Sequence, residues 1–144
     1  FCSSLAGLIT MPQWSVYVAS KWAITGFADS IRSELKKFNV RITTLHPGAV
    51  ITEFFDPSKA DIDISKMGKA LTVDEVAEKV YEATFTDKRR IVIPGSSQTF
   101  SNVYRFFPGL AEKMINNMVK EVEYTDRSKE DEPEFSYVKQ GEVE

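Results

Sequence analysis

The chain contains 144 residues, of which 42% are hydrophobic and 27% charged, a composition typical of a globular domain with its own core. The net charge of −3 is small, so we expect no nucleic-acid partner. A single cysteine excludes an intramolecular disulfide and favours a reducing compartment, so we expect a cytoplasmic protein.

The charges are unevenly distributed along the chain. Residues 121–144 carry nine acidic and three basic side chains, a net charge of −6, whereas residues 1–120 carry twelve acidic and fifteen basic side chains, a net charge of +3. We therefore expect residues 1–120 to form one folded domain and residues 121–144 to form an acidic, flexible tail.

The first elements in chain order are a strand end, a helix and a second strand. The opening FCSS is typical of a strand terminus, and a loop then runs to Gln13. Apolar residues at spacings of three and four predict a helix from about Trp14 to Phe38. The run NVRITTLHP predicts a strand that ends at the Pro47-Gly48 turn.

The second half of the chain continues this alternation. Residues 53–70 show no sustained period and predict a loop with at most a short helix. Thr72 and Glu75 form a capping-box pattern that predicts the start of a helix, and RRIVIPG predicts a short buried strand. Residues 98–120 are apolar enough to form a helical segment that packs on the body or lines a pocket; a membrane-surface or partner-binding helix is the alternative.

Strands that alternate with helices predict an α/β fold with a parallel sheet and flanking helices. Because crossover connections are normally right-handed, we expect both helices on the same face of the sheet. The other face and one edge would then lack cover, so the fold would be incomplete. On this interpretation residues 1–144 made alone would aggregate or stay molten.

Three side chains suggest proton chemistry. Tyr17 and Lys21, in the sequence YVASK, are four residues apart and share one helix face, where the ammonium can stabilise a charged phenolic oxygen. Ser4 lies thirteen residues before Tyr17, at a strand's carboxyl end, where parallel α/β sheets bind ligands. A serine hydrolase is disfavoured because no G-x-S-x-G pattern surrounds Ser4, and His46, the chain's single histidine, is interpreted as structural.

These residues resemble a known family. SSLAG, YVASK and HPGAVIT, in this order and at these distances, are similar to the carboxyl-terminal half of a classical short-chain dehydrogenase/reductase. The helix text GFADSIRSEL and the strand IVIPG extend the resemblance over about residues 1–95. It implies that residues 1–120 are the carboxyl-terminal half of a single Rossmann-like domain. The amino-terminal cofactor-binding half would be absent, since no glycine-rich dinucleotide-binding turn occurs here.

The resemblance also implies residue roles. Tyr17 would be the general acid and base, Lys21 would assist it and bind the nicotinamide ribose, and Ser4 would hold the substrate carbonyl. The cofactor-binding residues would be Tyr17, Lys21, Pro47, Gly48, Val50 and Thr52. The implied cofactor is NADP or NAD, with NADP slightly preferred.

The implied reaction is reversible hydride transfer between a nicotinamide cofactor and a carbonyl or alcohol, with no metal. The apolar residues Phe54, Phe55, Ile62, Ile64 and Met67 suggest an apolar small-molecule substrate. We expect a homo-oligomer. The alternatives are a non-catalytic relative that serves as a binding or scaffold module, and a reductase that contacts a membrane through residues 98–120, which is not favoured.

Overall fold

The computed structural model describes residues 1–52 and 70–119, together with the side chains up to residue 117. Its elements in chain order are η1 (Leu5–Gly7), α1 (Ser15–Leu35), η2 (Lys36–Phe38), β1 (Thr44–Pro47), α2 (Val73–Thr84), β2 (Arg90–Ile93), α3 (Ser96–Phe106) and α4 (Pro108–Val119). The expectations for residues 53–69, including the apolar substrate-side residues, and for the tail at 121–144 lie outside the described residues.

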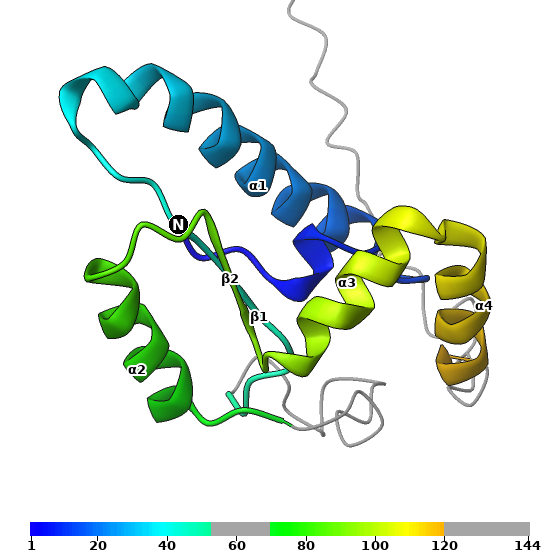
Figure 1. Ribbon diagram of the computed structural model, residues 1–144. Coiled ribbons are helices and arrows are strands. Elements are labelled where there is room, and N and C mark those ends of the chain that lie inside the picture. Colours follow the sequence, from blue (N-terminus) through cyan, green and yellow to red (C-terminus); the bar gives the residue numbers. More distant parts are fainter. Residues whose placement is uncertain (53–69, 120–144) are drawn as a thin grey trace, which may run out of the picture.

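The predicted parallel sheet is present, although it is smaller than expected. β1 and β2 pair in parallel, with His46 opposite Val92. The predicted first strand is reduced to a single parallel bridge between Cys2 and Leu45, on the other side of β1 from β2. The fold class predicted from the sequence is therefore confirmed: an α/β arrangement with a parallel sheet and flanking helices (Figure 1).

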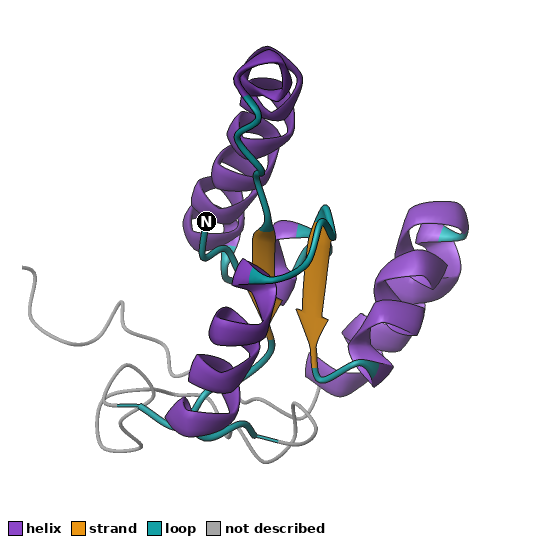
Figure 2. Cartoon of the chain, turned by 60° about the vertical axis from the view of Figure 1, so that its left-hand side comes forward, coloured by secondary structure: helices purple, strands orange, loops and turns teal. Residues whose placement is uncertain are grey.

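The two crossover helices lie on opposite faces of the sheet, so the expectation of a shared face is wrong. α1 and α2 flank the strands from opposite sides in Figure 1, and the turned view in Figure 2 agrees. The side chains of the strands alternate accordingly. Leu45 and Ile93 form a buried apolar cluster with Leu71, against which Val76 of α2 packs. Arg90 lies on the opposite face of β2 from Ile93, and its guanidinium donates to the Asp29 carboxylate of α1.

Opposite faces explain why β1 is buried throughout. All four of its residues are inaccessible to solvent, and they include two polar ones, Thr44 and His46. The connection from Cys2 through α1 to β1 and the connection from β1 through α2 to β2 step across the sheet in the same direction, so their handedness must differ. The statistical preference for right-handed crossovers does not hold for both.

Local sequence signals account for most helix limits. The predicted capping box is confirmed: the Thr72 hydroxyl accepts from the Glu75 N–H, and the Glu75 carboxylate accepts from the Thr72 N–H. The predicted helix over residues 14–38 is α1 followed by η2, and it ends at Asn39 in the left-handed conformation with φ 58°. Within the predicted helical segment, the described residues form two helices, α3 and α4, because Pro108 disfavours helical backbone at Phe107.

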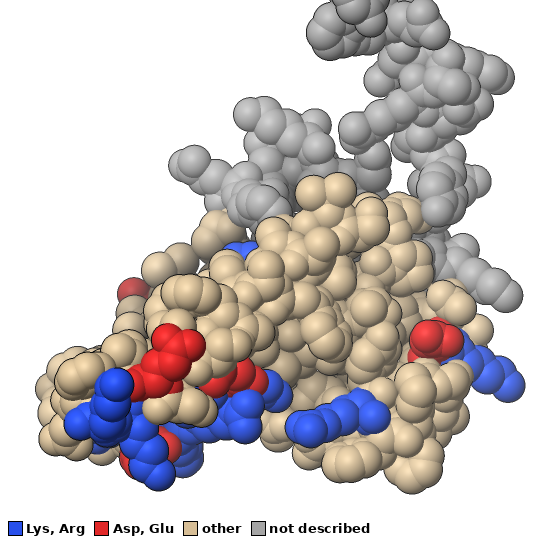
Figure 3. Space-filling view, turned by 90° about the horizontal axis from the view of Figure 1, so that it is seen from above, with Lys and Arg blue, Asp and Glu red and all other residues tan. Residues whose placement is uncertain are grey.

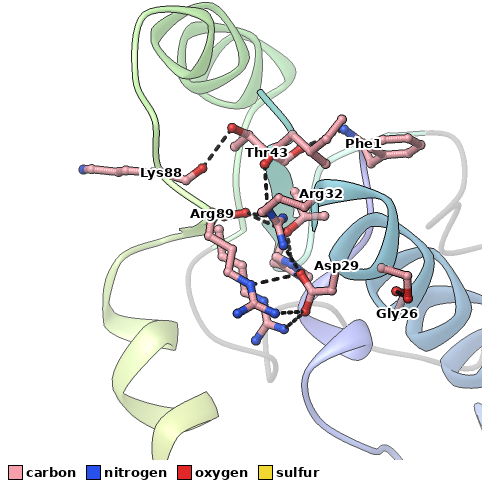
Figure 4. A network of polar contacts seen from close by, with 12 residues as sticks. Phe1, Gly26, Asp29, Arg32, Thr43, Lys88 and Arg89 are labelled. Atoms are coloured by element: carbon pink, nitrogen blue, oxygen red, sulfur yellow. Dashed lines mark hydrogen bonds and ion pairs between the residues drawn. The ribbon is translucent and has the colours of Figure 1, made fainter. Parts of the chain in front are cut away.

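A charged network fixes α1 to the start of the two strands (Figure 4). The Asp29 carboxylate on α1 accepts hydrogen bonds from Arg32 on the same helix and from Arg89 and Arg90 at β2. Arg32 also donates to the carbonyl oxygens of Ile42 and Arg89, at 3.0 and 3.1 Å. Burial alone raises the pKa of the Asp29 carboxyl, but the three arginines outweigh it and hold that pKa well below its usual range.

Replacing Asp29 by Asn tests this network. Three guanidinium groups would lose their shared anion, so we expect the free energy of unfolding of the full protein to fall by about 2–4 kcal/mol. Because its folded pKa is depressed, the stabilisation by Asp29 is present above about pH 4 and lost as pH falls further. The variant should therefore lack this acid-dependent component in denaturant titrations run from pH 3 to 7.

The matched control is Glu82→Gln, which breaks the exposed pair with Lys79 on α2. An exposed pair of this kind contributes less than about 1 kcal/mol. Equal effects of the two substitutions would contradict the assigned role of Asp29.

Candidate functional site

Ser4 lies at the carboxyl end of β1, where the sequence predicted a ligand site. The chain follows β1 as far as Ser3, whose N–H donates to the Leu45 carbonyl at 2.9 Å. Ser4 then caps η1: its Oγ accepts from the Ala6 N–H at 3.2 Å and donates to the Pro47 carbonyl at 3.4 Å. Two of the predicted site residues, Ser4 and Pro47, are thus in direct contact.

The neighbouring serine joins this turn to α1. Ser3 Oγ donates to the Lys21 carbonyl at 3.0 Å, and Thr25 Oγ1 donates to the same oxygen at 2.9 Å. Ser3 and Thr25 are only 3% and 6% exposed, and their hydroxyl oxygens are 3.2 Å apart. We call the contact of Ser3, Thr25 and the Lys21 carbonyl the serine junction. It holds the helical turn that carries Lys21 against the residue next to Ser4.

Gly7 makes this close approach possible. A Cβ atom built on Gly7 would lie 2.8 Å from Thr25 Oγ1 and 2.9 Å from the Lys21 carbonyl oxygen, and closer still to Ser3 Oγ. Real Cβ atoms do not approach other atoms so closely, so η1 can reach α1 only with glycine at this position.

Tyr17 and Lys21 are adjacent on α1, as their spacing predicted. The Lys21 Nζ atom lies 5.4 Å from the centroid of the Tyr17 ring, and Trp14 contacts the same ring edge-on at 5.2 Å between centroids. Both Tyr17 and Lys21 are half-buried. Their helical turns belong to the part of α1 that the serine junction fixes to the turn at Ser4.

The remaining predicted residues follow β1. The Gly48 N–H donates to the Ile93 carbonyl at 2.7 Å, and Val50 forms a parallel bridge with Leu71. Thr52 is exposed, and among the described residues its hydroxyl makes one long contact, 3.4 Å, with the Val50 carbonyl. A polar partner at this end of the sheet could therefore reach the Thr52 hydroxyl.

His46 is fully buried beside this end of the sheet. Its Nδ1 lies 2.9 Å from the Ser4 carbonyl oxygen, and its Nε2 lies 3.1 Å from Thr44 Oγ1. Burial lowers the pKa of the His46 imidazole, which favours the neutral ring. The sequence-based interpretation of His46 as structural agrees with its burial, but its contact with Ser4 had no signal in the sequence.

One further contact links α3 to the site. The hydroxyl oxygens of Thr10 and Tyr104 are 2.7 Å apart, and Thr10 belongs to the loop between Ser4 and Tyr17.

In residues 1–52 and 70–119 no group of His, Cys, Asp and Glu is arranged to hold a metal ion. None of the described helices is both long and apolar enough to cross a bilayer.

Known proteins are similar to this chain in sequence and in fold. The family model described as short chain dehydrogenase matches residues 1–63. The chain is 29% identical over 116 residues to the uncharacterized oxidoreductase YbbO of Escherichia coli K12, an alignment that covers 74% of this chain and 43% of that protein.

Two solved structures share the fold. A short chain dehydrogenase from Burkholderia cenocepacia in complex with NADP matches with a TM-score of 0.66 and 18% identity, over 79% of this chain and 45% of that one. A short chain dehydrogenase from Mycobacterium paratuberculosis bound to NAD matches with a TM-score of 0.52 and 25% identity, over 67% of this chain and 44% of that one.

These matches support the resemblance to the short-chain dehydrogenase/reductase family that the motifs predicted, and the chain shares the Rossmann fold of the two solved structures. It spans less than half of the length of each of these three proteins.

Gly7→Ala tests the packing of the serine junction. The added methyl group must displace the Ser3 or Thr25 hydroxyl, so we expect the full protein to lose about 1–3 kcal/mol of unfolding free energy. Chemical denaturation measures this loss. Gly26→Ala is the control, because a Cβ there meets no atom within 4 Å and alanine is the better helix former. If Gly7→Ala were as stable as Gly26→Ala, the close packing described here would be wrong.

Proposed function

We propose that the protein containing this chain is an NADP- or NAD-dependent oxidoreductase that interconverts a carbonyl and an alcohol, with Tyr17 as general acid and base. One observation carries the proposal: the Ser3–Ser4 turn bonds to Pro47 at the end of β1 and to the Lys21 turn of α1. The three residues with the family's proton-transfer pattern thus belong to elements joined at one end of the sheet. The similarity to the short-chain dehydrogenase/reductase family supports the same conclusion.

The residues at this end of the sheet fit the nicotinamide part of such a cofactor. The Thr52 hydroxyl is exposed, and Lys21 supplies an ammonium group beside Tyr17. These groups could donate hydrogen bonds to a ribose and a carboxamide, while Pro47, Gly48 and Val50 offer backbone and apolar contacts. Proteins of the same fold that hold NADP and NAD support a nicotinamide cofactor without separating the two.

A nicotinamide cofactor, when bound, would supply hydride chemistry to the substrate's carbonyl carbon. Tyr17 gives its phenolic proton to the carbonyl oxygen, and Lys21 stabilises the phenolate that remains. Ser4 donates its hydroxyl hydrogen bond to the same carbonyl oxygen as negative charge develops there. The reverse reaction uses Tyr17 as the base that takes the alcohol proton.

The present partner of the Ser4 hydroxyl is compatible with this role. Its contact with the Pro47 carbonyl is 3.4 Å long, beyond the usual range for a hydroxyl donor. A substrate oxygen at a normal distance would therefore compete well for the same proton.

The outer surface of α1 supports the proposed self-association. Figure 3 shows a broad surface without charged side chains between charged groups at either end. From Ser15 to Ala28 the only charged residue is Lys21, whereas Val16 and Phe27 are 82% and 56% exposed. We propose that a homo-oligomer buries part of this surface.

The proposed substrate is a small, apolar carbonyl compound or alcohol.

Tyr17→Phe tests the catalytic assignment. Turnover of the full protein is followed by nicotinamide absorbance across a panel of ketones, and cofactor binding by nicotinamide fluorescence. Because the phenolic proton is transferred in the transition state, we expect kcat to fall by about 10²–10⁴-fold while cofactor binding remains measurable.

Tyr81→Phe is the matched control, since Tyr81 is exposed on α2 and should tolerate the change. A Tyr17→Phe enzyme with more than half of the wild-type turnover would end the assignment. Cofactor binding without turnover of any carbonyl by the wild type would favour the non-catalytic alternative.

A further inference from the structure

The backbone pairing of the first residues with β1 ends at Ser3. At Ser4 the side chain of His46 takes over and keeps the chain attached to β1. Up to Ser3 the backbone is held by reciprocal bonds with Leu45, whose N–H donates to the Phe1 carbonyl at 2.9 Å. At Ser4 the chain turns into η1, and its carbonyl oxygen faces the His46 ring at 2.9 Å instead. The same oxygen accepts from the Gly7 N–H at 2.9 Å.

The proton positions on His46 follow from its two partners. A carbonyl oxygen can only accept, so the ring nitrogen facing Ser4, Nδ1, must carry the hydrogen. In the neutral ring Nε2 then accepts from the Thr44 hydroxyl. The alternative acceptor for that hydroxyl, the Arg89 carbonyl, already receives the Thr44 N–H and an Arg32 guanidinium hydrogen. The buried ring is therefore fully satisfied in one tautomer.

We propose that His46 is a positioning residue that sets the orientation of Ser4 for catalysis; this inference rests on the proposed function. Two successive residues of β1 contact Ser4: His46 holds its backbone carbonyl, and Pro47 meets its hydroxyl over the longer distance of 3.4 Å. Since β1 is paired in register with β2, Ser4 takes its orientation from the sheet.

Three substitutions of His46 separate this role from simple packing. In Asn the amide nitrogen is bonded to Cγ, as Nδ1 is in His, so His46→Asn keeps a donor at the level that faces Ser4. In Gln the amide nitrogen lies one bond farther along, at the level of Nε2, which faces Thr44. His46→Leu removes both polar groups and keeps a side chain of similar bulk.

The experiment measures kcat, KM and thermal stability of the full protein for these variants, alone and combined with Ser4→Ala. We expect His46→Leu and His46→Gln to lower kcat roughly tenfold, because one buried hydrogen bond and the alignment of Ser4 are lost. His46→Asn should keep several-fold more turnover than His46→Leu. In the Ser4→Ala background His46→Leu should lower kcat no further, because the group that it orients is gone.

Two results would overturn the proposal. One is a His46→Leu effect on kcat that is equally large with and without Ser4, which would make His46 a purely structural residue. The other is turnover of His46→Asn as low as that of His46→Leu at matched thermal stability.

Nitrogen-15 NMR of the His46 ring provides a readout that does not depend on activity. We expect hydrogen on Nδ1 and none on Nε2 at neutral pH, and the opposite tautomer would refute the contact with Ser4. If the wild type reduced no carbonyl, or Tyr17→Phe were fully active, the proposed function would fail. The NMR result would still decide whether His46 holds Ser4.

Discussion

The serine junction is the contact on which the candidate site depends. Ser3 and Thr25 both donate to the Lys21 carbonyl, and this one oxygen ties the turn at the end of the sheet to α1. A helix carbonyl in the middle of α1 already accepts an intrahelical bond, so the two extra donors add strength where the helix meets the turn. Without the junction, Ser4 would keep its contacts with His46 and Pro47, but the helix that carries Tyr17 and Lys21 would lose its hydrogen bond to the turn next to Ser4.

The two faces of the small sheet differ in polarity. The face toward α2 is apolar, with Leu45 and Ile93 packed against Leu71. The face toward α1 is polar: Thr44 and His46 are buried there, and Arg90 reaches the Asp29 carboxylate. Buried polar groups are costly unless their hydrogen bonds are made, and the His46 ring meets that condition through its contacts with Ser4 and Thr44. They also specify one orientation, which an apolar face would leave less defined.

The sequence predicted what depends on local signals and missed what depends on contacts across the chain. The capping box at Thr72 and the spacing of Tyr17 and Lys21 are local, and both are confirmed. The expectation of a common face for both helices is wrong, because the statistical rule for handedness does not hold for both crossovers. The alternation of apolar Leu45 and polar His46 along β1 corresponds instead to two covered faces. The roles of Ser3 and His46 had no local signal, since their partners lie 18 and 42 residues away.

The measurement that tests the account most directly is the transfer of labelled hydrogen by the full protein. A reduced nicotinamide cofactor that carries deuterium at both C4 positions is supplied with a ketone that the protein reduces, and the alcohol product is analysed by mass spectrometry. The account predicts one deuterium on the carbinol carbon of the product from the wild type, with product formation almost abolished in Tyr17→Phe. An alcohol without deuterium, or a labelled product formed equally fast without the Tyr17 hydroxyl, would contradict it.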